Sequence, residues 1–237
     1  MIVPARDEAA RVGEVCRTMP AFVDHIVVVD DASRDATADR ARAADPRVEL
    51  VRHARNRGVG AALVTGYRRA LALGADVAAV MAGDGQMAPA ELERVVGPVV
   101  AGAADYVKGE RLSHPDVRRR VPAVRYWGLR ALAPLASLAT GLDVTDSQCG
   151  YTAVSRAALA AIELDALWPR YGYPNDLLAR LALAGQRIVE VPVSPLYHGG
   201  KSGLRPRHFA VMLGLIARGA VRRAGRALRG GSRARPR

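Results

Sequence analysis

The N-terminal half of the chain alternates short apolar segments with longer segments whose apolar residues recur at helical spacing. Apolar runs that lack polar alternation are typical of strands buried on both faces of a parallel sheet. The four predicted strands end near Val3, Val29, Val51 and Met81, and the last of them begins at Asp76. A helix is predicted after each strand, for example from Ala61 to Leu73. This alternation predicts a doubly wound, mostly parallel α/β sheet.

Acidic residues and glycines follow the ends of these predicted strands. Asp30 and Asp31 follow the second strand, residues 56–60 the third, and residues 83–86 the fourth. Because the carboxyl ends of parallel strands share one edge, where ligands bind, we expect these residues to gather there. Taken singly, Asp30 and Asp31 could cap a helix and residues 58–60 could form a tight turn. Together they predict a site for a phosphorylated ligand.

Asp84 and Gln86 are the candidate metal ligands at this edge. Their oxygen atoms suit Mg²⁺ or Mn²⁺ and are poor ligands for zinc. Gly83, just before Asp84, leaves room for close approach of the backbone. The alternative is a simple strand-to-helix turn in which Asp84 caps the helix that begins at Pro89.

Positive charge is concentrated at the C-terminal end of the chain. The 237 residues are half hydrophobic and carry a net charge of +12, yet the segment from Lys201 onward has ten Arg, one Lys and no acidic residue. Nucleic-acid binding is disfavoured, because the chain has few aromatic residues and no recognised reading motif. A membrane-surface helix attracted to anionic lipids is favoured instead. Its expected apolar face consists of Phe209, Val211, Met212, Leu215 and Ile216. A docked core helix followed by a solvated basic end is the alternative.

A second basic segment spans residues 117–130 and leads into the apolar residues 131–139. It predicts an amphipathic helix in which Arg118, Arg119 and Arg120 face solvent or lipid. The two cysteines, Cys16 and Cys149, have neither metal-ligand nor disulfide spacing and fit a reducing compartment. Neither a signal peptide nor an apolar stretch of about 18 residues is present, so secretion and a spanning helix are not expected. These features predict a cytoplasmic protein, peripheral at the inner face of the cell membrane.

The order and spacing of the motifs resemble the family-2 glycosyltransferases of GT-A fold. The resemblance is nearest to the branch with dolichol-phosphate mannosyltransferase and the bacterial polyprenyl-phosphate glycosyltransferases. The matching segments are residues 3–8, 29–33, 56–62, 83–86, 107–111, 146–151 and 190–193. The resemblance implies a single Rossmann-like GT-A domain over residues 1–205, followed by a basic amphipathic helix and tail over residues 206–237.

The resemblance also assigns roles to individual residues. It places the donor nucleotide at Pro4, Ala5, Arg6, Glu8, Asp30, Asp31, Gly58, Gly83 and Lys201. Lys201 lies in a glycine-rich loop expected to act as a lid. Arg111 and Arg125 match arginines that reach a lipid phosphate or the donor diphosphate, for which the planar guanidinium fork is suited. One departure concerns the metal site, where Ala82 replaces the first acid of the usual Asp-x-Asp and leaves only Asp84.

The implied reaction is inverting transfer of a sugar from a UDP- or GDP-sugar to a polyprenyl or dolichyl phosphate, with Mg²⁺ or Mn²⁺. A phosphate acceptor is already anionic near neutral pH and needs little help from a base. Asp146 and Asp176 are the remaining base candidates, and Asp146 is preferred, with a turn or cap role as its alternative. Two other functions stay open: transfer to a saccharide or other hydroxyl acceptor, and non-catalytic binding of a nucleotide sugar or membrane surface. The sequence does not predict the oligomeric state.

Overall fold

A computed structural model describes residues 1–196 and 206–231 of the chain. Its described part contains a seven-stranded sheet in the order β3-β2-β1-β4-β6-β5-β7. The strands are β1 (Ile2–Ala5), β2 (Ile26–Asp30), β3 (Val48–Arg52), β4 (Val77–Val80), β5 (Tyr106–Glu110), β6 (Thr152–Ser155) and β7 (Ile188–Pro192). Only β6 runs antiparallel to its neighbours, β4 and β5. The predicted α/β class and mostly parallel sheet are confirmed, and the four predicted strands are β1 to β4.

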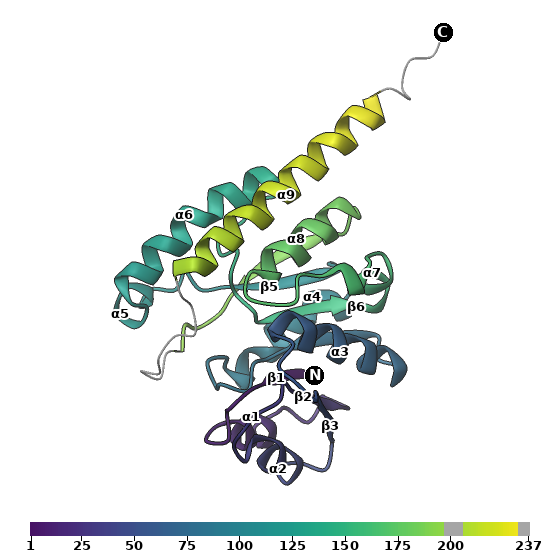
Figure 1. Ribbon diagram of the computed structural model, residues 1–237, viewed down its shortest axis with the longest axis vertical. Helices are drawn as coiled ribbons and strands as arrows, with labels where there is room; N and C mark the ends of the chain where they lie inside the picture. Colours follow the sequence, from purple (N-terminus) through teal and green to yellow (C-terminus); the bar gives the residue numbers. More distant parts are fainter. Residues whose placement is uncertain (197–205, 232–237) are drawn as a thin grey trace.

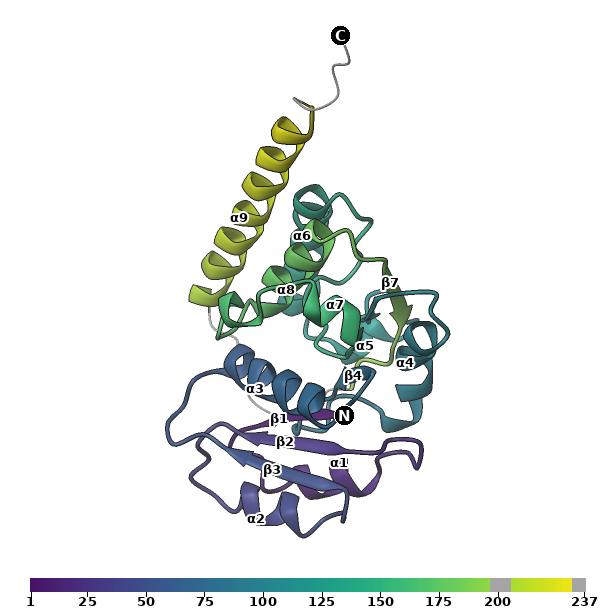
Figure 2. The same cartoon turned by 90° about the vertical axis from the view of Figure 1, so that its right-hand side faces the viewer.

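Helices cover both faces of the sheet (Figures 1 and 2). The helices are α1 (Val12–Arg17), α2 (Thr37–Arg42), α3 (Val59–Ala72), α4 (Leu92–Val100), α5 (Val117–Arg120), α6 (Ala123–Thr140), α7 (Arg156–Ala160), α8 (Tyr173–Leu183) and α9 (Pro206–Gly231), with 3₁₀ turns at Pro89–Glu91 and Leu164–Ala166. Successive strand residues point to opposite faces. Accordingly, Val3 packs in one core cluster with α1 and α4, whereas Ile2 packs in another with α3 and α8. Both faces of the sheet are therefore buried, which explains why β1, β2 and β4 consist almost entirely of apolar residues.

The C-terminal helix α9 packs against α6 and α8 (Figure 1). Met212, Leu215 and Ile216 are buried, and Met212 and Ile216 form one cluster with Leu132 and Ala139 of α6. The expectation that this apolar face meets lipid is therefore wrong, because the rest of the protein covers it. The alternative of a docked helix holds for this part of α9. The division of the chain at residues 205 and 206 stays a prediction.

Beyond its docked part, α9 continues away from the body toward the C-terminus (Figures 1 and 2). Even so, no helix in residues 1–196 and 206–231 combines the length and apolarity needed to cross a membrane.

Candidate active site at the carboxyl edge of the sheet

The loops that follow β1 and β2 are bonded to each other. The backbone N–H of Asp7 donates to Ser33 Oγ (3.0 Å), and the N–H of Arg34 donates to Asp7 Oδ1 (2.8 Å). Asp7 and Ala32 both adopt left-handed backbone, with φ of 56° and 60°. Such conformations are uncommon for residues other than glycine and persist only where surrounding contacts hold them, often at functional sites. These two loops thus form a fixed rim at the sheet edge.

The loop after β4 lies against β1. The N–H of Gly83 donates to the Pro4 carbonyl (3.1 Å), and a Cβ on Gly83 would stand 3.0 Å from the Cβ of Ala5. Pro4 and Ala5 are buried, whereas Arg6 is exposed on the rim. The predicted donor residues Pro4, Ala5 and Gly83 therefore bring the β1 and β4 loops together, and a side chain at position 83 would press them apart.

The negative charge of Asp84 acts on Glu8 across this junction. Burial and the negative charge of Asp84 raise the pKa of Glu8. Asp84 is partly exposed, and its Oδ1 accepts a hydrogen bond from the N–H of Gln86 (3.0 Å). The described residues include no cluster of three or more His, Cys, Asp or Glu able to hold a metal ion. A cation at Asp84 and Gln86 would consequently take most of its ligands from a bound ligand and water, as Mg²⁺ commonly does.

Asp30 and Asp31, at the end of β2, have different surroundings. The fully buried carboxylate of Asp30 accepts a hydrogen bond from the N–H of Ser33 (2.9 Å) and lies 3.0 Å from Nε of Arg52. The Arg52 side chain is largely exposed, so this ion pair connects the buried carboxylate to the surface of the rim.

Asp31 is a hydrogen-bond hub for the loop after β3. Its Oδ2 accepts from the Nδ2 of Asn56 (2.9 Å) and the N–H of Gly58 (2.7 Å). Its Oδ1 accepts from the N–H of Arg57 (2.8 Å) and lies 2.7 Å from Nδ1 of His53. Burial opposes ionisation, but these bonds outweigh it and lower the pKa of Asp31. The contacts favour a role in which Asp31 shapes the loop rather than one in which it binds the nucleoside.

Gly58 begins α3 where only glycine fits. Its φ is +97°, and a Cβ at this position would lie 2.4 Å from the carbonyl oxygen of Pro169. The same carbonyl accepts a hydrogen bond from the N–H of Ala61 (3.0 Å). The predicted donor residue Gly58 is thus a point of close contact between the start of α3 and the segment before α8.

We expect Asp31→Asn to destabilise the protein by roughly 1.5–3 kcal/mol, the usual worth of hydrogen bonds to a charged group. In the variant, an amide NH₂ group would replace one carboxylate oxygen. That group is a hydrogen-bond donor, and it would face the donors of the 53–58 loop without an acceptor. Urea unfolding measures the loss, with Asp24→Asn at an exposed site as the matched control. Equal stability of the two variants would contradict the hub assignment.

Arg111 and Asp146 form a bidentate ion pair just beyond β5. The Nε of Arg111 lies 2.7 Å from Oδ2 of Asp146, and its Nη2 lies 3.1 Å from Oδ1. Asp146 is fully buried; burial alone would raise its pKa, but Arg111 and Lys108 hold that pKa well below its usual range. A buried carboxylate fixed in this way is a poor proton acceptor. The geometry therefore favours a positioning role for Asp146 over the predicted role as a base.

Two further charged residues, Lys108 and Glu190, hold the loop that carries Asp146. Lys108 is fully buried and donates to the carbonyl oxygens of Asp146 and of Cys149, the latter at 3.2 Å. Glu190 accepts hydrogen bonds from the N–H groups of Thr145 (2.6 Å) and Asp146 (3.2 Å). Sequence reasoning included both residues in matching motifs but gave them no role. The available signal was a charged residue among the apolar residues of each motif, at positions 107–111 and 190–193.

The other base candidate, Asp176, is also engaged by the protein. It is buried, and its Oδ2 accepts from the N–H of Trp168 (2.9 Å) and lies 2.9 Å from Nε of Arg180. These bonds join the segment before α8 to the first turn of that helix, at Asp176, and to its last turn, at Arg180. The contacts favour a structural role for Asp176.

Arg125 lies in the first turn of α6 and is partly buried. Leu112 and Tyr126, the chain neighbours of Arg111 and Arg125, pack in the same hydrophobic cluster. The fold thus brings the segments of the two predicted phosphate-binding arginines together. Lys201 lies outside the described residues.

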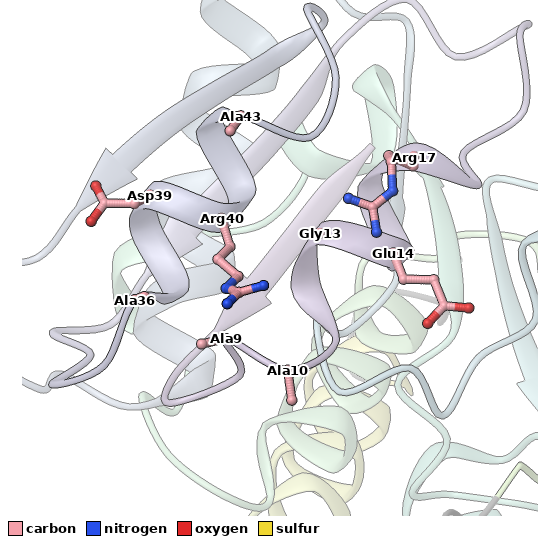
Figure 3. A pocket seen from close by; sticks show the side chains of 9 residues that line it. All are labelled: Ala9, Ala10, Gly13, Glu14, Arg17, Ala36, Asp39, Arg40 and Ala43. Carbon is pink, nitrogen blue, oxygen red and sulfur yellow. The ribbon is translucent and has the colours of Figure 1, made fainter.

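A groove of about 420 Å³ lies between α1 and α2, and its lining includes none of the predicted site residues (Figure 3). Small residues such as Gly13 form its floor, and Arg17 and Arg40 extend into the space between the helices. Glu14 and Asp39 balance these two arginines. The groove therefore has no net charge with which to favour a phosphorylated ligand.

The strand order, the paired loops at the sheet edge and the acid after β4 define a GT-A glycosyltransferase. Residues 1–162 match the family model described as Glycosyl transferase family 2, and the chain belongs to that family.

Relatives with assigned names cover most of the chain. It is 30% identical over 213 residues to the UDP-N-acetylglucosamine–dolichyl-phosphate N-acetylglucosaminyltransferase of Methanococcus voltae, covering 83% of this chain and 85% of that one. It is 36% identical over 178 residues to the undecaprenyl-phosphate mannosyltransferase of Micrococcus luteus, covering 71% and 70%. Both relatives carry names of sugar transferases that use a polyprenyl-type phosphate.

Solved structures share the fold. One is glucosyl-3-phosphoglycerate synthase from Mycobacterium tuberculosis in complex with Mn²⁺, uridine diphosphate and phosphoglyceric acid. It superposes with a TM-score of 0.68 at 23% identity and covers 94% of this chain and 77% of that chain. At this identity the likeness establishes the GT-A fold alone.

Proposed function

We propose that the protein transfers a sugar from a nucleotide-sugar donor, UDP- or GDP-linked, to a polyprenyl or dolichyl phosphate, with inversion at the anomeric carbon. The observation that carries the proposal is the arginine pair. Arg111 is held in place by a buried Asp146, and Arg125 lies on a segment packed beside it. Two relatives, 30% and 36% identical to this chain over the aligned residues, have names that include a polyprenyl-type phosphate acceptor.

The proposed reaction is a single displacement. An oxygen of the acceptor phosphate forms a bond to the anomeric carbon while the bond from that carbon to the donor diphosphate breaks. The acceptor is anionic at neutral pH, so no protein carboxylate needs to remove a proton. This agrees with the surroundings of Asp146 and Asp176, which are buried and bonded to arginine. Arg111 and Arg125 would place guanidinium charge beside the phosphate oxygens, while the Nε and Nη2 of Arg111 stay bound to Asp146.

We propose Asp84 and Gln86 as the protein ligands of Mg²⁺ or Mn²⁺. Their hard oxygen atoms fit either ion, and the repulsion between Glu8 and Asp84 marks a place where a cation would be favoured. When bound, the ion would neutralise charge on the departing nucleoside diphosphate. The structural neighbour from Mycobacterium tuberculosis has been solved with Mn²⁺ and uridine diphosphate together.

The test is a panel of UDP- and GDP-sugars offered with a short-chain, water-soluble polyprenyl phosphate and either ion. We expect a lipid-linked sugar from one donor class. Transfer to a saccharide or protein hydroxyl, with none to the phosphate, would replace the acceptor assignment by the second function left open above. Donor binding without hydrolysis or transfer in any arm would favour a non-catalytic binding module.

Replacement of either arginine by lysine is expected to lower transfer about 10- to 150-fold, because each lost charged hydrogen bond costs roughly 1.5–3 kcal/mol. Lysine retains the charge but presents it as a point, without the planar fork. Initial rates for Arg111→Lys and Arg125→Lys are compared with those for Arg17→Lys, an exposed residue of α1. Full activity in both site variants would return these arginines to a structural role.

The lipid acceptor implies that the protein works at a membrane surface, and we propose the inner face of the cell membrane. The docked apolar face of α9 cannot supply the contact. Another surface must therefore meet the lipid.

A further inference from the structure

The outer face of α6 carries large apolar side chains in contact with solvent. Val124, Trp127 and Leu138 are 85%, 61% and 73% exposed. Positions 124, 127, 131, 134 and 138 follow one another at intervals of three or four residues, so they share one face of the helix. Leu129 and Ala133 on the opposite face are buried. The exposed stripe therefore points away from the body of the protein.

A second stripe runs along α9, beside α6 (Figure 1). Leu213, Val221 and Leu228 are 45%, 72% and 79% exposed. Exposed alanines lie before the first of them, at position 210, and between them, at positions 217 and 224. The opposite face of α9, which includes Met212 and Leu215, packs onto the protein. Both stripes thus lie on the side away from the body, and we call them together the α6–α9 outer surface.

Arginines border this surface, and acids are absent from its two helices. Neither α6 nor α9 contains Asp or Glu anywhere in its sequence. The bordering arginines with exposed side chains are Arg118, Arg119, Arg120, Arg130, Arg218, Arg222, Arg223 and Arg226. Of these, Arg120 pairs with Asp116 at the start of α5 (3.6 Å). Tyr126 holds two of the arginines beside the apolar stripe: the guanidinium carbons of Arg118 and Arg130 lie 5.7 and 5.8 Å from its ring centre. The Tyr126 ring also meets Trp127 edge to face at 5.2 Å.

We propose that the α6–α9 outer surface docks the protein on an anionic lipid bilayer. The inference rests on the proposed function, since the acceptor lipid resides in such a bilayer. Tryptophan favours the membrane interface, and apolar side chains on the face of a helix enter the boundary between headgroups and acyl chains. Arginine side chains can extend along that boundary to lipid phosphates. A row of apolar residues bordered by arginines fits this occupant in both shape and charge.

A second copy of the chain fits the same surface less well. Pairing two such surfaces would bring the arginines of both copies together, and neither α6 nor α9 offers an acid to pair with them. Like charges brought together in an interface oppose association. An anionic bilayer supplies the opposite charge.

The test is flotation of the full chain with vesicles of phosphatidylcholine and phosphatidylglycerol at low salt. Trp127→Asp and Leu138→Asp place a charge where the apolar stripe would enter lipid, at exposed positions that the fold does not need. We expect each variant to lower the vesicle partition coefficient about ten-fold or more, as loss of one buried large side chain implies. Val100→Asp, at a 69% exposed apolar residue of α4, is the matched control and should bind as the parent protein does.

Charge is tested separately with Arg119→Gln and Arg130→Gln. Each should weaken binding to the anionic vesicles about five-fold and leave the weak binding to pure phosphatidylcholine unchanged. The two aspartate substitutions are also combined in one double variant. If the Trp127→Asp, Leu138→Asp double variant bound the anionic vesicles as strongly as the parent protein does, the proposal would be overturned. Sedimentation without vesicles tests the other occupant. If the parent protein were a dimer and the double variant a monomer, the surface would be assigned to a second copy of the chain instead.

Transfer to the water-soluble short-chain acceptor separates this inference from the proposed function. The double aspartate variant should retain that activity, because its substitutions lie outside the site at the sheet edge. Loss of vesicle binding with retained transfer supports the docking surface. Absence of transfer in the parent protein would defeat the proposed function while the vesicle result still stands.

Discussion

Replacing Asp84 by asparagine is expected to lower the rate of sugar transfer by about 100-fold or more. Losses of this size follow when an enzyme loses one group that stabilises charge in the transition state. Asp84 is the one carboxylate of its motif, since Ala82 occupies the other usual acid position. An asparagine keeps the hydrogen bond that Asp84 accepts from the N–H of Gln86, so the local turn should persist. Initial rates measured over a range of Mg²⁺ and Mn²⁺ concentrations give the effect.

The control for this experiment is Asp39→Asn, at an exposed acid of α2. The converse substitution, Ala82→Asp, should lower the metal concentration needed for half-maximal rate, because it restores a second carboxylate where the family usually has one. If Asp84→Asn retained activity within a few-fold, the metal assignment at this edge would fail.

The second large effect is expected at the buried ion pair. Asp146→Asn should destabilise the protein by about 3–5 kcal/mol, because removing one partner leaves the Arg111 and Lys108 charges uncompensated in a buried site. The double variant Asp146→Asn, Arg111→Gln should lose less than the sum of the two single losses, as residues in contact do. Urea unfolding of the four proteins provides the cycle. Additive losses would show that the two side chains act independently.

The same pair predicts how stability depends on pH. The pKa of Asp146 is lower in the folded protein than the value near 3.9 expected for an unfolded chain. Its contribution is thus fully present above the unfolded pKa and is lost as the pH falls toward the folded pKa. The stability difference between the parent protein and Asp146→Asn should be constant near neutral pH and shrink below about pH 4. An unchanged difference down to pH 2 would contradict the lowered pKa.

Much of the N-terminal sheet could be predicted because its strands are apolar on both faces and end in polar residues. The predicted strand from residue 76 to 81 is observed as Val77–Val80, and the predicted helix 61–73 as Val59–Ala72. The strands β5, β6 and β7 were not predicted, and neither was the antiparallel direction of β6. Its apolar composition does not encode a direction.

The site was harder to predict, because a carboxylate after a strand looks the same whatever it binds. The partners of Asp31 are residues 53–58, which lie 22 to 27 positions away in the chain. The folded structure alone shows that residues of the 53–58 loop, rather than a nucleoside, form hydrogen bonds with the carboxylate oxygens of Asp31. The amphipathic pattern of α9 was ambiguous in the same way, since an apolar face suits a protein neighbour as well as lipid.

The contact between Pro169 and the start of α3 has a consequence for how the chain can be divided. The family match ends at residue 162, but the carbonyl of Pro169 accepts the N–H of Ala61 and lies where any side chain on Gly58 would stand. A fragment ending at residue 162 would leave this helix start uncovered and one of its amides without its acceptor. The start of α3 is therefore completed by a segment that lies outside the family match, and a truncated or recombined protein should take both sides of this contact from one parent.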